Sequence, residues 1–183
     1  MGRRITSVDS EEFDALFTTF KQSAFRLETL QVYAANEDDV RAVLSGETRP
    51  ANPMGEKWDA RIRADRVAGK AWQRVHVIEE PLTDYMRYEM TVYVENVTAG
   101  EDVRVIPVRR GDWPPGVPRH DWWLFDDTDL WLMSYDPTGA LLAVEQVEDL
   151  AEVDQHRRWR DAAVRASSAW SAYMTGAELP SAV

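Results

Sequence analysis

Two charged residues stand on a segment whose pattern otherwise predicts a half-buried strand. Residues 24–33 alternate apolar and polar side chains, and Arg26 and Glu28 occupy two of the polar positions. Side chains two apart on a strand share one face, so both charges point towards the same neighbours. This pattern allows two kinds of chemistry, a buried ion pair that fixes the strand to a helix or a binding site for a charged ligand.

A second charged group begins the helix expected over residues 84–97, which Thr83 or Asp84 caps after Pro81 ends the preceding strand. In open α/β sheets, ligand crevices lie beyond the carboxyl ends of strands. We therefore expect the two groups to form a buried ion network or, together with aromatic residues, to line a pocket for a small polar or anionic ligand. The residues concerned are Arg26, Glu28, Trp58, Asp84, Tyr85, Arg87, Tyr88 and Glu89.

Tryptophan and acidic residues gather in the C-terminal third of the chain. Residues 121–154 hold ten Asp or Glu and no Lys or Arg, within a chain of net charge −11. Trp122 and Trp123 are adjacent, so on a strand they point to opposite faces and cannot both enter one core. Either helices cover both faces of the sheet, or tryptophans anchor a basic protein partner. The candidate interface residues are Trp122, Trp123, Asp126, Asp127 and Trp131, although Asp126 and Asp127 also suit a turn.

Composition disfavours several function classes. The acidic segment repels phosphate backbones, so we expect no direct nucleic-acid binding. The absence of Cys excludes thiol chemistry, and His76, His120 and His156 are too far apart in the sequence to indicate a metal site. No motif for a serine nucleophile or a phosphate-binding loop occurs. We expect no catalytic residue, no metal and no cofactor, and we expect a cytoplasmic protein because no apolar run approaches the roughly 18 residues of a membrane span.

The pattern of elements predicts a single α/β domain over residues 1–183, with a mixed central sheet and helices packed on it. A strand, helix, strand unit should form a parallel crossover over residues 73–108, and three closely spaced strands should form an antiparallel meander. Asn36 should cap a short helix that Gly46 closes, ahead of a loop with Pro50, Pro53 and Gly55. Helices are expected at 9–22, with Asp9 as its cap, 57–68, 84–97 and 150–174, and strands at 24–33, 73–79, 102–108, 122–125, 130–135 and 140–147.

Three motifs carry a family resemblance: SAFRLETL at residues 23–30, PLTDY at 81–85 and WWLFDD at 122–127. Their order resembles that of an actinobacterial family with a domain of unknown function. The resemblance implies one domain of this length and association with helix-turn-helix regulators encoded nearby, but no activity. His76 departs from the pattern, which would have Arg there.

Residues 73–147 are also similar, more remotely, to one half of a phospholipase-D-like fold. The active form of that fold needs His and Lys two residues apart, and here His76 is followed by Val77, Ile78 and Glu79. The resemblance therefore implies a catalytically inactive version.

These observations favour a non-enzymatic regulatory or interaction protein. It would act with a helix-turn-helix regulator through its acidic, Trp-rich face. The alternative is a small-ligand sensor with a pocket around Arg26, Asp84 and Arg87, and an unrecognised hydrolase is a third possibility.

Overall fold

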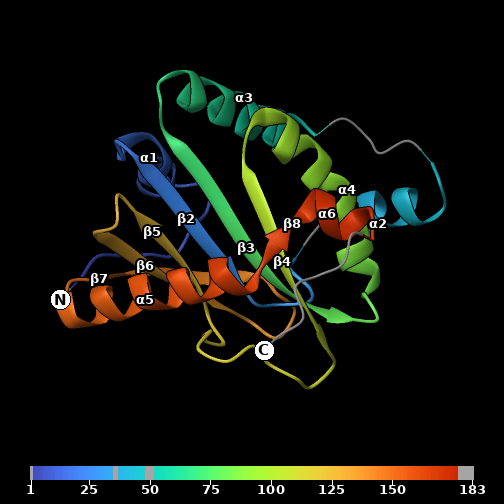
Figure 1. Ribbon diagram of the computed structural model, residues 1–183. Coiled ribbons are helices and arrows are strands. Elements are labelled where there is room, and N and C mark those ends of the chain that lie inside the picture. Colours follow the sequence, from blue (N-terminus) through green and yellow to red (C-terminus); the bar gives the residue numbers. More distant parts are fainter. Residues whose placement is uncertain (1, 35–36, 48–51, 177–183) are drawn as a thin grey trace.

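The computed structural model describes residues 2–34, 37–47 and 52–176. In these residues a mixed sheet of eight strands is covered by helices on both faces (Figure 1). The predicted α/β class and mixed sheet are therefore confirmed. Asn36 and Pro50, for which a helix cap and a loop were predicted, lie outside the described residues.

The strands follow the order β1-β7-β6-β5-β2-β3-β4-β8 across the sheet. The central strands β2, β3 and β4 are parallel, and all other neighbours are antiparallel. The predicted parallel strand, helix, strand unit and the antiparallel meander are both present. The bounds are β1 Arg4–Ile5, β2 Ser23–Glu28, β3 Ala71–Glu80, β4 Asp102–Arg109, β5 Asp121–Phe125, β6 Asp129–Tyr135, β7 Leu141–Val147 and β8 Ser168–Ala169.

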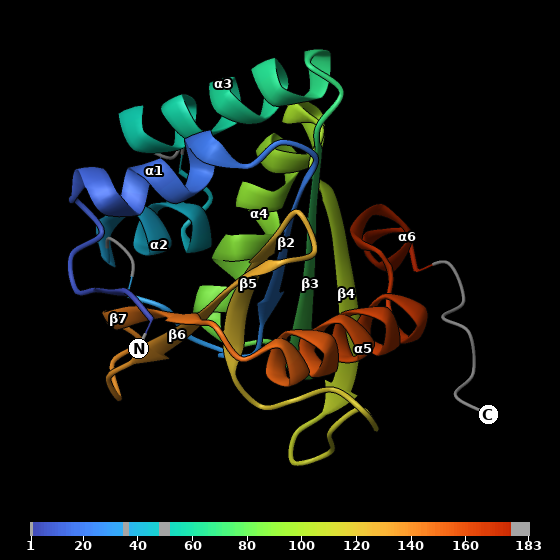
Figure 2. The same cartoon turned by 90° about the vertical axis from the view of Figure 1, so that its left-hand side faces the viewer.

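The helices divide between the two faces of the sheet. Figure 2 shows α1 to α4 on one side and α5 on the other. The short helix α6 packs beside the β4 edge through Trp170 and Tyr173. The bounds are α1 Glu11–Thr19, α2 Glu37–Leu44, α3 Pro53–Val67, α4 Asp84–Ala99, α5 Leu150–Ala166 and α6 Trp170–Met174.

Several predicted boundaries are wrong. The helix expected over 57–68 begins at Pro53, inside the predicted loop, because the Asn52 side chain caps it by accepting from the Gly55 amide. Ser10, and not Asp9, caps α1, because its hydroxyl accepts the Phe13 amide proton. The strand expected over 24–33 ends at Glu28, since the next amide, that of Thr29, donates to the Asp121 carboxylate. The helix expected over 150–174 stops at Ala166. Arg104 holds the hydroxyl and carbonyl of Ser167, and the chain then pairs with β4 as β8.

Apolar residues build three clusters around the sheet, one on the α5 side and two on the side of α1 to α4. One of these two joins Ile78, Val103 and Val105 of the strands to Met86, Met90 and Tyr93 of α4. On the α5 side, Phe25, Leu27 and Val75 are buried with Val153 and Ala163 of the helix. On the opposite side, apolar packing against α1 and α3 is limited to one end of the strands, where Ala24, Trp72 and Phe17 meet. Further along that side, β2 and β3 carry charged and polar residues instead.

Helices on both faces explain the adjacent tryptophans. Trp122 lies in the α5 core and Trp123 in the α1 and α3 core, with 0% and 1% of their surfaces exposed. Trp131 is also fully buried. Core packing on both faces is therefore confirmed. The alternative, in which these three side chains are exposed anchors, is wrong for this fold.

Candidate functional site

The polar positions of β2 and β3 form two rows under α4. Parallel pairing sets Arg26 beside Arg74 and Glu28 beside His76. Because side chains alternate along each strand, all four point to the side covered by α1 to α4, while their sequence neighbours fill the α5 core. The register of the two strands thus concentrates charge in the interior.

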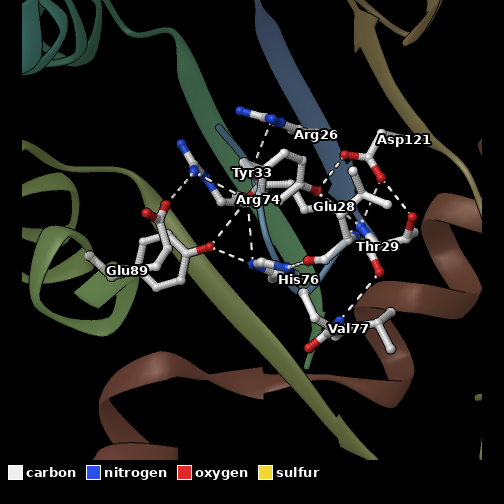
Figure 3. A network of polar contacts seen from close by, with 12 residues as sticks. Arg26, Glu28, Thr29, Tyr33, Arg74, His76, Val77, Glu89 and Asp121 are labelled. Carbon is white, nitrogen blue, oxygen red and sulfur yellow. Dashed lines mark hydrogen bonds and ion pairs between the residues drawn. The ribbon is translucent and has the colours of Figure 1, made fainter. Parts of the chain in front are cut away.

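A buried ion network joins Arg26 and Arg74 to Glu28 and Glu101, and Figure 3 shows its centre at Glu28. Glu28 Oε1 lies 2.9 Å from Arg26 Nη2, and Glu28 Oε2 lies 3.1 Å from Arg74 Nη1. Arg74 also directs Nε to Glu101 Oε1 at 2.9 Å, just before β4. Burial alone would raise the pKa of Glu28, but the two guanidinium groups outweigh it and lower the pKa to about 2. Glu28 is therefore ionised and saturated with partners.

Glu89 of α4 faces the same network, but it has fewer ion-pair partners than Glu28. Its Oε1 lies 3.8 Å from Arg74 Nη1, and its Oε2 accepts a hydrogen bond of 3.1 Å from the Tyr85 hydroxyl. Burial and the nearby Glu28 carboxylate raise the pKa of Glu89 to about 7, against the opposing effect of Arg74. Figure 3 shows Glu89 pointing from the helix towards Arg74. This carboxyl group can change its charge near neutral pH.

His76 closes the network at its inner end. Its Nε2 lies 2.8 Å from the Leu30 carbonyl oxygen and its Nδ1 lies 2.7 Å from the Tyr93 hydroxyl. Burial lowers the pKa of His76, so the ring is neutral, with Nε2–H donating to the carbonyl and Nδ1 accepting from Tyr93. His76 therefore serves as a structural link between β3, α4 and the segment after β2.

A second group of hydrogen bonds holds the end of β2. Asp121 accepts from the Thr29 amide at 2.8 Å, from the Thr29 hydroxyl at 2.6 Å and from the Tyr33 hydroxyl. The Tyr33 ring in turn packs against Arg26. These contacts hold the Tyr33 ring in place, and the ring in turn fixes the position of the Arg26 guanidinium.

A pocket of about 740 Å³ opens between this network and helices α1 to α4. Aromatic rings make most of its walls, whereas Arg26, Arg74, Asp39, Glu89 and Asn96 provide polar groups. The aromatic residues come from four elements and are Phe13, Phe17, Trp58, Tyr85, Tyr88 and Trp123. The arrangement suits a molecule with an apolar body and a polar or charged group.

An adjacent hollow of about 520 Å³ shares Phe13, Phe17 and Trp58 with this pocket. Its charged residues are largely used within the fold, because Arg61 pairs with Asp14 at 2.6 Å. The larger pocket is therefore the better candidate for recognition of a charged group.

The structure brings together six of the eight residues predicted for a ligand site, and Tyr88 is one of them. Arg26, Trp58, Tyr85 and Glu89 line the pocket, and Glu28 lies beneath it in the ion network. Asp84 and Arg87 do not take part. They lie on the solvent side of α4, 3.5 Å apart, with side chains 71% and 58% exposed.

The predicted ion network is thus present with a different membership. The Arg26–Glu28 pair was expected, but the partner of Glu89 is Arg74, and Arg87 has no role in it. Sequence reasoning missed Arg74, Glu101 and Asp39. The alternation of Trp72, Arg74 and His76 along one strand is the signal that could have identified Arg74.

Asp126 and Asp127, predicted for a protein interface, serve the turn between β5 and β6. Both have positive φ, 50° and 60°, which Asp tolerates better than most residues. Asp126 accepts hydrogen bonds from the amides of residues 21–23, and Asp127 pairs with Arg160. The contacts match the alternative reading of these two residues as turn formers.

The described residues contain no group of three or more His, Asp or Glu arranged to hold a metal ion. His120 and His156 do meet, with their Nε2 atoms 3.0 Å apart next to Trp159. Nor do the described helices include one with the length and apolar character that crossing a bilayer requires.

Fold and site together define a three-layer α/β domain with a buried ion network at the floor of an aromatic pocket. The chain belongs to the family described as "Domain of unknown function (DUF6879)", whose model matches residues 11–175. Comparison with curated proteins gives no match. The predicted membership of a family of unknown function is confirmed. The actinobacterial origin and the phospholipase-D-like similarity stay predictions.

Proposed function

We propose that this domain binds a small organic molecule in the pocket between the sheet and helices α1 to α4, as a ligand-binding or sensor module. One observation carries the proposal: a pocket of about 740 Å³ joins aromatic walls to a charged floor. This volume falls in the range of about 300–1,000 Å³ typical of ligand sites, and mixed apolar and polar walls are usual in them.

The ion network supports this proposal because it prepares the floor before any ligand arrives. Arg26 is held by Glu28 and by the ring of Trp123, with its guanidinium carbon 5.4 Å from the ring centroid. Arg74 is held by Glu28 and Glu101. Fixed polar groups lose little conformational freedom when a ligand binds, which favours affinity.

A ligand in this pocket would touch several helices at once. Phe17 belongs to α1, Trp58 to α3 and Tyr88 to α4. Occupancy would therefore stabilise their mutual packing, and this is the change that a partner could recognise. Action with a helix-turn-helix regulator stays a prediction from the family resemblance, and its interface would need surfaces other than the buried tryptophans.

The test is to fill the pocket and ask which stabilising compounds lose their effect. Val92 lines the pocket, whereas Val94 on the same helix is 50% exposed and away from it. Small organic compounds that raise the melting temperature of the wild type should fail with Val92→Phe and keep their effect with Val94→Phe. If compounds stabilise both variants equally, they bind elsewhere and the proposal fails.

A further inference from the structure

The two guanidinium groups at the pocket floor are already paired with carboxylates. Arg74 spends Nε and Nη2 on Glu101 and Nη1 on Glu28, and Arg26 Nη2 also pairs with Glu28. Arg26 Nε has no hydrogen-bond partner, but the atom is buried and inaccessible to a ligand in the pocket. Positive charge at this floor is thus matched by Glu28 and Glu101 alone.

Glu89 is a third carboxyl group beside these two arginines. Its nearest cationic atom, Arg74 Nη1, is 3.8 Å away and closer to Glu28. Its Oε2 accepts a hydrogen bond from the Tyr85 hydroxyl, which brings no positive charge to balance the carboxylate. An ionised Glu89 therefore leaves a net negative charge at the pocket wall.

Asp39, on α2, adds a fourth carboxylate to the lining of the pocket. It is only 8% exposed. Within the residues that the structure describes, no hydrogen bond or ion pair reaches its side chain. Buried polar groups are rarely left without a partner, and the oxygens of this carboxyl group open to the pocket instead of being sealed in the core. Among the described residues, the group is therefore available to a donor or cation from outside.

The walls around these two carboxyl groups are aromatic. The rings of Trp58, Tyr85 and Tyr88 line the same pocket, and ring faces attract cations more strongly once water is excluded. An anion would instead meet the carboxyl groups of Glu89 and Asp39, and Arg26 and Arg74 already pair with Glu28.

We propose that the ligand of this pocket is a small organic cation, an amine or quaternary ammonium compound whose charged group lies between Glu89 and Asp39 while its apolar body packs on Trp58 and Tyr85. This inference rests on the proposed function, because it names the chemical class that the same pocket takes.

The experiment compares three probes of similar size and different charge: 2-phenylethylammonium, 2-phenylethanol and 3-phenylpropanoate. Their binding to the full chain at pH 8 is measured by isothermal titration calorimetry, with melting temperature as a second readout. The ammonium probe should bind about tenfold or more tightly than the alcohol, and the carboxylate should bind least.

Two variants remove the proposed contacts one at a time. Glu89→Gln and Asp39→Asn should each weaken binding of the ammonium probe about tenfold and leave the alcohol unchanged. Asp84→Asn changes the total charge equally but alters an exposed residue outside the pocket, so it should have no effect. If one pocket variant fails to fold, the other still gives the answer.

The outcomes separate this inference from the proposed function. Preference for the alcohol or the carboxylate, blocked by Val92→Phe, overturns the cation and retains a ligand pocket. Binding of the ammonium probe that Glu89→Gln and Asp39→Asn leave intact also overturns the inference. If no probe binds at millimolar concentration, the inference fails and the proposed function loses support as well.

Discussion

The two faces of β2 and β3 differ in chemistry although their residues alternate along the same strands. Leu27 and Val75 face α5 in a mainly apolar core, whereas their chain neighbours Glu28 and Arg74 face α4 in an ion network. On the α5 side, the burial of apolar surface stabilises the fold. On the α4 side, desolvation of the charges must be offset by partners, and the arrangement ends in a pocket. The comparison indicates that one face maintains the fold and the other is available for recognition.

The largest effect should follow removal of Arg74. Arg74→Met leaves Glu101 buried without its ion-pair partner and Glu28 with Arg26 alone, so the free energy of unfolding should fall by about 3–5 kcal/mol at pH 7. Leu27→Ala, on the apolar face, should lose about 2–5 kcal/mol through a cavity. Urea unfolding measures both. The pH dependence of stability distinguishes the two variants more sharply. In acid, Glu28 becomes protonated in both the wild type and Arg74→Met, so the loss of stability caused by Arg74→Met should become smaller. The loss caused by Leu27→Ala should not change with pH.

Glu89→Gln should stabilise the protein, in contrast to most changes of buried residues. A glutamate titrates near pH 4.3 when unfolded, but the pKa of Glu89 is raised to about 7 in the fold. Its contribution to stability is full below about pH 4 and is lost as the pH rises towards 7. The variant should therefore gain on the order of 1–3 kcal/mol over wild type at pH 8 and nothing at pH 4. A loss of stability at pH 8 would contradict the claim that the ionised carboxylate strains this face.

Lowering the pH should destabilise the protein through its histidines, which is the opposite of the effect expected through Glu89. Burial lowers the pKa of His76, His120 and His156, so the fold binds fewer protons than the unfolded chain. Their contribution is present above about pH 6.5 and is lost as the pH falls below that value. In the Glu89→Gln background, which removes the opposing titration, the melting temperature should fall between pH 7.5 and 5.5. A constant melting temperature over this interval would show that these rings are not held neutral.

The smallest effect is expected at the exposed pair of α4. Asp84 and Arg87 lie 3.5 Å apart and are mostly exposed, so Asp84→Asn should change the free energy of unfolding by less than about 0.5 kcal/mol. Thermal unfolding at low and high salt measures it. A large loss would place this pair in the structural network, against the geometry.

The fold was largely predictable because hydrophobic period and turn residues act locally. The crossover from β3 to β4 and the meander followed from the spacing of apolar runs and from Pro and Gly between them. The C-terminal break at Ser167 was not predictable, because it depends on hydrogen bonds from Arg104, 63 residues earlier.

The site was predictable only in part, for the same reason. Arg26 and Glu28 are conspicuous on an apolar strand, so their pairing could be inferred from the sequence. Which residues of α4 face them depends on helix rotation. The prediction kept Asp84 and Arg87, whereas Tyr85, Tyr88 and Glu89 are the predicted residues of this helix that line the pocket. Asp39 lies on another helix and enters the pocket only through tertiary packing.

The most direct test of a site built around Glu89 is the affinity for 2-phenylethylammonium at pH 6 and pH 8, measured by calorimetry. The groups that face Glu89 are Glu28 and Arg26 on β2, Arg74 on β3 and Tyr85 on its own helix, and Arg26 stays positive because its pKa is raised. Glu28, with its pKa lowered to about 2, and Arg74 and Tyr85, with pKa values raised, keep their charge states in this range.

Ionisation of Glu89 alone should therefore make binding about tenfold tighter at pH 8 than at pH 6, since its pKa is about 7. The Glu89→Gln variant should bind equally weakly at both values. Equal affinities of the wild type at pH 6 and pH 8 would contradict a site in which Glu89 receives the cation.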